Sequence, residues 1–167
     1  MELIIKQSII HIGFSTMGNT IMCAIVGGTR LTEKELKLLQ IARIRGRDYS
    51  NVFMKGQSWI CNHRAIPTTE KSNPEHNQPF GVDYKIVHNG TIANDKELGN
   101  TTGEIDSSVL PKVLNCTNID TLLSTIQKLK GSYAIAILKP NGTFYLACNY
   151  KPIAYTYELD EKVARKN

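Results

Sequence analysis

The sequence lacks closely spaced cysteines, and this absence excludes several kinds of protein. No C-x-x-C pair occurs, and the four cysteines are Cys23, Cys61, Cys116 and Cys148. Thiols so far apart in sequence argue against a structural zinc site and a dense disulfide framework. We expect no metal and no cofactor. Cys61 and Cys148 lie in strand-like runs and are interpreted as core residues. Reduced thiols suit the cytosol, so we expect a cytoplasmic protein.

The sequence also lacks a long uninterrupted hydrophobic run. Residues 1–21 contain apolar stretches, but Lys6, Gln7 and His11 interrupt them, and no A-x-A cleavage site follows. The segment is therefore too short and too broken for a membrane span or a secretory signal. The formal net charge is +5, yet the basic residues are scattered and no aromatic residues are interleaved with them. We therefore expect neither a membrane nor a nucleic acid as partner.

What is present indicates one globular domain, because 167 residues with 41% apolar content suffice for a core. Strands, helices and strands follow one another through hairpin-length links, which predicts an α+β fold with antiparallel sheets. Residues 69–82 are expected to form a polar loop without secondary structure. The strand after this loop is followed by His88-Asn89-Gly90, where a break is expected because Asn-Gly is a strong turn signal. Helices are expected over residues 32–45 (with a Thr32–Glu35 capping box), 106–114 and 120–130, and strands over 22–28, 51–54, 59–62, 84–87, 132–138, 144–148 and 153–157.

Cys23 heads a short apolar run that ends in paired glycines. If translation starts at Met22, the small side chain of Cys23 favours removal of that Met, and Cys23 gains a free α-amine. An α-amine with a pKa near 8 beside a thiol with a pKa of about 8.5 forms a minimal pair of base and nucleophile. The alternative is a small buried hydrophobic side chain at a strand start.

Residues 1–21 leave three interpretations open. They are a start assigned too far upstream, a propeptide that is cut off to free Cys23, or an additional strand, in which case Cys23 has no α-amine. We favour the first and then the second. The expected organisation is an N-terminal extension over 1–21, a domain over 22–157 and a charged tail over 158–167.

Seven short motifs follow one another along the chain. They are the strand headed by Cys23, then Arg45-Gly46-Arg47-Asp48, His63-Arg64, Gln78-Pro79, His88-Asn89-Gly90-Thr91-Ile92-Ala93-Asn94, Ile105-Asp106-Ser107-Ser108-Val109-Leu110 and Gly131-Ser132-Tyr133-Ala134. In this order and spacing they resemble the class II glutamine amidotransferase domain, an N-terminal-nucleophile hydrolase. The glutaminase domain of asparagine synthetases is the most similar in motif style. The resemblance runs from Met22 to about Tyr157.

The resemblance implies a four-layer αββα sandwich and a reaction in which L-glutamine is hydrolysed to glutamate. Cys23 would attack the side-chain amide carbon while its own α-amine takes the thiol proton. The Asn89 side-chain amide and the Gly90 backbone N–H would stabilise the oxyanion that forms. The released ammonia would pass to a separate synthetase subunit, which makes asparagine, an amino sugar or a modified nucleobase.

The same resemblance assigns residues to the amino-acid end of the substrate. Arg64 would bind the α-carboxylate through its bidentate guanidinium, and Asp106 would accept the α-ammonium. The backbone at Ile66 would help to hold the substrate. Arg45 and Asp48 are expected to be structural, as a polar pair that braces the site. The loop over 69–82 resembles a glutamine loop that closes over bound substrate.

The chain departs from the family pattern at two side chains and at its C-terminal end. Ala24 stands in place of a usual Gly, and Ser108 in place of a usual acidic residue. A further core strand is expected after Ile153, so the sheet edge is exposed, covered by a partner or completed by residues 1–21. The alternative function is a catalytically inactive regulatory or binding module, and a further alternative is an N-terminal-nucleophile peptidase or amidase.

Overall fold

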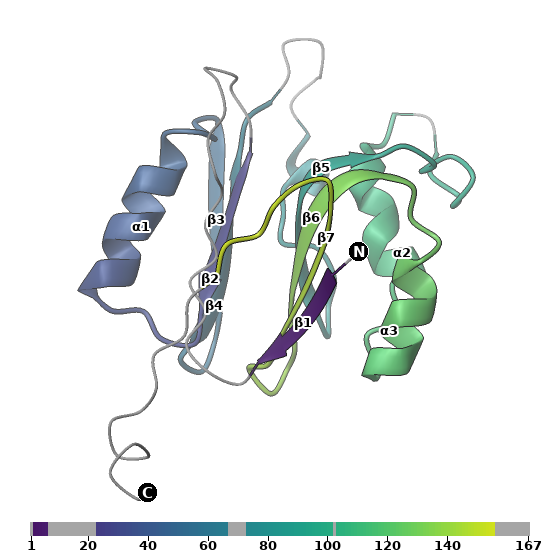
Figure 1. Cartoon of the computed structure of the whole chain (residues 1–167). Helices are drawn as coiled ribbons and strands as arrows, with labels where there is room; N and C mark the ends of the chain where they lie inside the picture. Colours follow the sequence, from purple (N-terminus) through teal and green to yellow (C-terminus); the bar gives the residue numbers. More distant parts are fainter. Residues whose placement is uncertain (1, 7–22, 67–72, 102, 156–167) are drawn as a thin grey trace, which may run out of the picture.

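Two antiparallel sheets lie in the middle of the molecule, with α1 on one outer side and α2 and α3 on the other (Figure 1). The computed structural model describes residues 2–6, 23–66, 73–101 and 103–155. The strands are β1 (Glu2–Lys6), β2 (Ala24–Gly28), β3 (Tyr49–Lys55), β4 (Ser58–Arg64), β5 (Lys85–Ile92), β6 (Gly131–Leu138) and β7 (Phe144–Asn149). The helices are α1 (Glu33–Arg43), α2 (Leu110–Val113) and α3 (Ile119–Ile126), and the 3₁₀ turns are η1 (Pro74–His76) and η2 (Asp106–Val109). This confirms the α+β class with antiparallel sheets.

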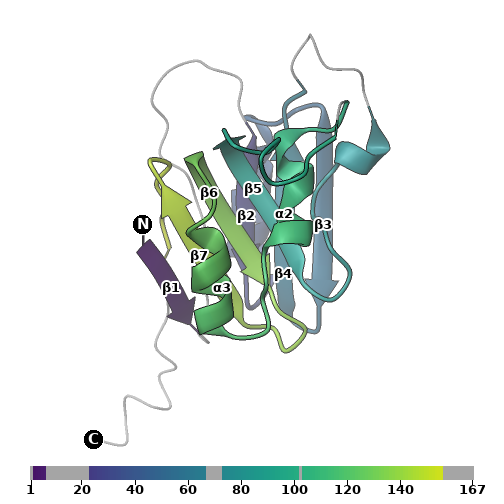
Figure 2. The same ribbon diagram turned by 90° about the vertical axis from the view of Figure 1, so that its right-hand side faces the viewer.

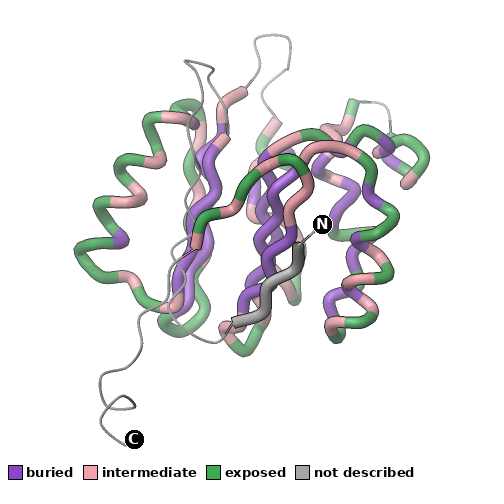
Figure 3. The backbone as a smooth tube through the Cα atoms, in the orientation of Figure 1, coloured by how far each residue is buried: buried purple, intermediate pink, exposed green. Residues whose placement is uncertain are grey.

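The smaller sheet has the strand order β2-β4-β3. Its central strand, β4, is buried along its whole length, and Figure 3 shows how burial concentrates in the strands. Helix α1 covers the outer face, where Leu39 and Ala42 pack against Val26, Trp59 and Cys61. The predicted capping box is present at its start, because the Glu35 carboxylate accepts the Thr32 backbone N–H at 2.8 Å.

The larger sheet has the strand order β1-β7-β6-β5, as Figure 2 shows from the side of α2 and α3. Its inner face packs against the smaller sheet through Ile25 and Ile60 on one side and Val87, Ala134 and Leu146 on the other. Its outer face packs under α2 and α3, whose buried side chains include Leu110, Leu122 and Ile126. Alternate residues of β5 therefore face different layers.

The predicted break at His88-Asn89-Gly90 is wrong, because β5 continues through these residues to Ile92. Gly90 pairs with Tyr133 of β6 and has φ 133°, and a Cβ on Gly90 would lie 2.1 Å from the Ser132 carbonyl oxygen. The glycine therefore serves close contact between β5 and β6 instead of a turn.

Other predicted elements differ in extent. The helix expected over 106–114 divides into η2 and α2, with Pro111 in the first turn of α2, and α3 ends at Ile126 instead of continuing to 130. The loop expected to lack secondary structure contains η1. No strand forms over 153–155 within the described part, although Ile153 and Tyr155 pack on the core between the sheets. Residues 67–72 and 156–157 lie outside the described residues.

Part of the segment 1–21 forms an edge strand. Glu2–Lys6, as β1, pairs antiparallel with β7 from Glu2 opposite Cys148 to Lys6 opposite Phe144. The additional strand was one of the three interpretations of this segment, and β1 occupies the sheet edge beyond β7 (Figure 2). That the mature protein lacks this segment stays a prediction.

Candidate active site

A cleft of about 150 Å³ lies where the start of β2, the end of β4, the middle of β5 and η2 meet. It brings together residues from five of the seven sequence motifs, far apart in the chain. Its lining residues are Cys23, Arg64, Ala65, Gln78, His88, Asn89, Gly90, Ile105, Asp106 and Ser107. Five of the predicted site residues, Cys23, Arg64, Asn89, Gly90 and Asp106, are among them.

Cys23 and Arg64 lie side by side at the same end of the smaller sheet, because Ala24 pairs with His63 in the register of β2 and β4. The Cys23 thiol is half-buried and lies 3.8 Å from the Ala65 carbonyl oxygen, which it can donate to. The Arg64 side chain is buried and donates from Nη1 to Asn77 Oδ1 at 3.3 Å. The burial of a guanidinium in a cleft is characteristic of a site for an anionic group.

Asn89 and Gly90 approach the cleft from β5. Asn89 shares the inner face of the sheet with Val87, which packs between the two sheets. Within the described residues the Asn89 side-chain amide forms no hydrogen bond, although the residue is only 6% exposed. A buried amide without a protein partner has its donors available for a ligand.

Asp106 begins η2 and accepts hydrogen bonds both from β5 and from within η2. Its Oδ2 accepts the Ile92 backbone N–H at 2.6 Å, and its Oδ1 accepts the Ser107 backbone N–H at 2.8 Å. A carboxylate has about four lone-pair sites, so capacity remains for a cationic group in the cleft. Arg64 and Asp106 thus provide one charge of each sign in the same small cavity.

His88 lines the cleft but comes from the opposite face of β5. Burial lowers the pKa of its imidazole to about 4, and the nearby Asp106 carboxylate acts in the opposite direction. The ring is therefore neutral near pH 7. The sequence motif contained this residue, but its role could not be inferred because the strand was expected to end there.

The other predicted residues lie beside the cleft. Ile66 is not part of the lining, and its backbone N–H donates to Asp48 Oδ2 at 2.7 Å. The Asp48 backbone N–H donates to the Arg64 carbonyl at 3.1 Å, so Asp48 links two residues around the end of β4. The predicted pair of Arg45 and Asp48 does not form among the described side chains, where Arg45 Nη1 is buried without a hydrogen-bond partner.

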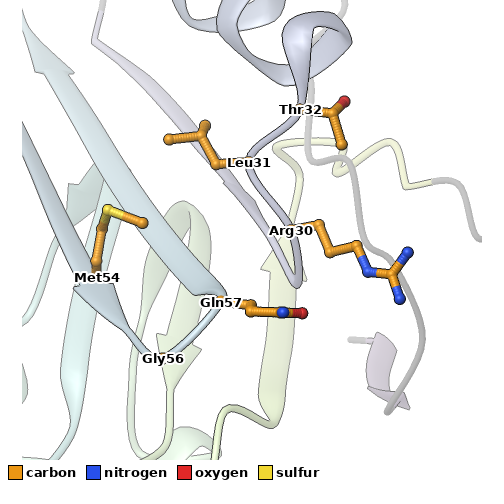
Figure 4. A pocket seen from close by; sticks show the side chains of 6 residues that line it. All are labelled: Arg30, Leu31, Thr32, Met54, Gly56 and Gln57. Atoms are coloured by element: carbon orange, nitrogen blue, oxygen red, sulfur yellow. The ribbon is translucent and has the colours of Figure 1, made fainter.

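A larger cleft of about 320 Å³ lies at the opposite end of the smaller sheet (Figure 4). Its lining residues are Arg30, Leu31, Thr32, Met54, Gly56 and Gln57. It has one cation, Arg30, and no thiol or carboxylate, so it lacks the cysteine nucleophile and the pair of opposite charges found in the smaller cleft. In the described ranges there is no cluster of three or more His, Cys, Asp or Glu suited to a metal ion. Likewise, no described helix has the length and apolar character needed to cross a membrane.

A half-buried thiol and one charged side chain of each sign share this cleft at the end of two antiparallel sheets, an arrangement that is able to act on an amide. A family model described as glutamine amidotransferase domain matches residues 63–164, and the chain belongs to this family. The resemblance to the glutamine amidotransferase domain, predicted from the sequence, is therefore confirmed. The match contains Arg64, Asn89, Gly90 and Asp106, whereas Cys23 lies outside it.

Several named proteins are similar to this chain. The 7-cyano-7-deazaguanine synthase of Sulfolobus acidocaldarius is 38% identical over 115 residues, which are 60% of this chain and 25% of that protein. The 7-cyano-7-deazaguanine synthase 2 of Sulfurisphaera tokodaii is 39% identical over 116 residues, 60% of this chain and 25% of that protein. Glutamine–fructose-6-phosphate aminotransferase (isomerizing) of Aquifex aeolicus is 26% identical over 140 residues, 75% of this chain and 23% of that protein. The chain spans about a quarter of the length of these curated relatives.

Proposed function

We propose that this chain is a glutaminase that hydrolyses L-glutamine to glutamate and ammonia and supplies the ammonia to a separate synthetase. The observation that carries the proposal is the convergence of Cys23, Arg64, Asn89, Gly90 and Asp106 on one cleft of about 150 Å³. A thiol nucleophile, an oxyanion site and a pair of opposite charges are what hydrolysis of a free amino-acid amide requires.

The proposed reaction has two steps. The Cys23 sulfur attacks the side-chain amide carbon of glutamine, and the Cys23 α-amine takes the thiol proton and passes it to the leaving nitrogen. The carbon–nitrogen bond breaks, ammonia leaves and a thioester remains. Water then attacks the thioester, which releases glutamate and restores the thiol. This mechanism requires Cys23 to be the first residue of the mature chain, because only then does its α-amine exist.

The environment of each group supports its proposed role. The unpaired Asn89 amide and the Gly90 backbone N–H would donate to the oxyanion, and close packing against β6 fixes Gly90 in place. Arg64 would bind the α-carboxylate, and Asp106 would bind the α-ammonium. Ala65 also lines the cleft, with its carbonyl oxygen 3.8 Å from Cys23 Sγ, and the backbone at Ile66 directly after it would help to hold the substrate.

The names of the relatives bear on the ammonia acceptor. Two of them are called 7-cyano-7-deazaguanine synthase, and a cyano group needs a source of nitrogen. This favours a synthetase that modifies a nucleobase over one that makes an amino sugar, although one relative is an aminotransferase for fructose-6-phosphate. An asparagine-synthetase-like partner, suggested by motif style, is less well supported, since none of these relatives has a name that mentions asparagine. A cytoplasmic location would fit an ammonia supply to such a partner.

The second candidate function is a catalytically inactive module of the same fold. The observation that favours it is β1, whose pairing with β7 along five residue positions ties the segment before Cys23 to the domain. While that segment stays attached, Cys23 has no α-amine, and the proposed base is absent.

The test is alkylation by a diazo-ketone analogue of glutamine, followed by mass spectrometry of the protein made from its natural gene. We expect the mature chain to begin at Cys23 and the adduct to lie on that residue. A Cys148→Ser variant is the matched control, because Cys148 is also half-buried but lies outside the cleft, and it should be labelled to the same extent. A chain that retains residues 1–21 and an unlabelled Cys23 would support the inactive module.

A further inference from the structure

The proposed reaction leaves one buried titratable side chain at the cleft without a role. His88 is 2% exposed and lies on β5 directly before the proposed oxyanion residue Asn89. Its backbone N–H donates to Gln78 Oε1 at 2.5 Å, which holds the strand at this point against the loop that follows η1. Its ring nitrogen Nε2 is buried and has no hydrogen-bond partner among the described residues.

The other ring nitrogen is connected to the proposed ammonium site through one hydroxyl group. His88 Nδ1 lies 2.6 Å from Ser107 Oγ, and Ser107 Oγ lies 3.3 Å from Asp106 Oδ1. The hydroxyl thus bridges the imidazole and the carboxylate, and both Asp106 and Ser107 line the cleft.

The protons in this chain can be assigned from the chemistry of each group. Asp106 as a carboxylate only accepts, so the Ser107 hydroxyl proton points toward it. Ser107 Oγ must then accept from His88 Nδ1–H, and a neutral imidazole keeps its lone pair on Nε2. The opposite tautomer would leave a buried N–H at Nε2 without an acceptor, and a buried orphan donor is the rarer and costlier arrangement.

We propose that His88 is a positioning residue for the α-ammonium of the substrate, because it orients the Ser107 hydroxyl that holds the Asp106 carboxylate. The inference rests on the proposed function for the identity of the substrate. In this proposal His88 itself transfers no proton to the substrate, since Nε2 is buried and Nδ1 is occupied by Ser107. Asp106 Oδ1 accepts two hydrogen bonds from Ser107, one from its backbone N–H and one from its hydroxyl. His88 orients the hydroxyl.

The test compares L-glutamine with 5-amino-5-oxopentanoate, which has the same amide and carboxylate but no α-ammonium. His88→Ala should raise KM for L-glutamine about tenfold with kcat nearly unchanged, the size expected for one charge-assisted hydrogen bond. KM for the analogue should stay within about twofold of wild type. His88→Asn should recover most of the loss, because its amide N–H can replace Nδ1–H and the unpartnered Nε2 needs no replacement.

Ser107→Ala and Ser108→Ala form a matched pair of variants. Ser107→Ala should reproduce the effect of His88→Ala. The Ser108 hydroxyl instead contacts Asn100 Oδ1 and the Ile105 carbonyl, so Ser108→Ala should stay close to wild type. In an Asp106→Asn background, the further substitution His88→Ala should change KM by less than about twofold, since both act through the same carboxylate.

Binding to a Cys23→Ala variant, measured by calorimetry with both compounds, separates this proposal from the proposed function. If wild type binds L-glutamine but does not hydrolyse it, the glutaminase function fails, and the same comparison of affinities still tests His88. The role of His88 is overturned if His88→Ala weakens both compounds equally, if kcat falls instead of KM rising, if His88→Asn does not recover binding, or if L-glutamine does not bind at all. Circular dichroism checks that each variant is folded, and Ser107→Ala serves if His88→Ala is not.

Discussion

At the scale of single residues, neighbouring side chains of β5 point to opposite faces of the sheet and so have different surroundings. Asn89 faces the space between the sheets, where its amide has no partner among the described residues, and His88 faces η2. Gly90 then brings the backbone against β6, where any Cβ would overlap with the Ser132 carbonyl. In the proposed site, these three successive residues would therefore act as oxyanion donor, positioning residue and point of close packing.

Asn89→Ala should lower kcat for glutamine hydrolysis by about 10²–10³-fold with a small change in KM, which is the usual loss for one oxyanion donor. The reason is that the amide would interact with charge that develops only in the transition state. Steady-state kinetics with ammonia detection measures this. Asn94→Ala is the control, because the Asn94 side chain bonds to the backbone of Lys128 and Lys130, away from the cleft, and its loss should change stability without this loss of kcat. A raised KM with unchanged kcat would contradict the assignment.

The sequence allowed five of the ten lining residues to be predicted, because they belong to short motifs whose order resembles a family. Gln78, His88 and Ser107 were present in those motifs, but their roles depend on contacts across long sequence separations. The bond from Ser107 to His88 joins residues 19 positions apart and required β5 to continue where a turn was expected. Local propensity cannot predict such a contact, because tertiary packing decides it.

At the scale of elements, glycines decide how closely the strands and connections approach. The Asn89-Gly90 dipeptide predicted a turn, yet β5 passes through it, because Gly90 relieves contact with β6. Gly46 follows α1, which ends at Arg43, after two residues. Its tighter constraint is the main chain of β4, since a Cβ there would lie 2.1 Å from the His63 carbonyl oxygen and 2.7 Å from the Arg64 nitrogen.

Gly46→Ala should therefore lower the free energy of unfolding by at least ~2 kcal/mol, since a backbone overlap cannot be relieved by a side-chain rotation. Because the clash falls on Arg64, KM for glutamine should rise as well. Gly56→Ala is the control: it has open space and φ +59°, and only the left-handed backbone costs about 1 kcal/mol. Urea unfolding measures the first effect and kinetics the second. Equal destabilisation by the two variants would show that packing on β4 is not the constraint.

At the scale of the whole molecule, the chemistry proposed for the cleft depends on whether the segment that contains β1 is still attached to Cys23. The proposed chemistry requires a free α-amine on Cys23, which lines the cleft. Strand β1 belongs to the segment that precedes Cys23, and it pairs with β7. The layers follow the order α1, two sheets, then α2 with α3, which agrees with the expected sandwich (Figure 1). The N-terminal-nucleophile character stays a prediction, because it depends on the segment before Cys23.

A variant that starts at Met22 tests this link, because removal of the initiator Met leaves Cys23 as the first residue. We expect glutamine hydrolysis to increase relative to a chain that keeps residues 1–21, since a free α-amine of pKa near 8 is then available as the base. We also expect a lower urea midpoint, because the β7 edge loses its five paired positions with β1. Ammonia release, intact mass and urea unfolding are measured on both proteins. The same truncation with Cys23→Ala is the control and should release no ammonia while unfolding at the lower midpoint. Full activity in a chain that keeps residues 1–21 would exclude the α-amine as base and require another group at the cleft to take the thiol proton.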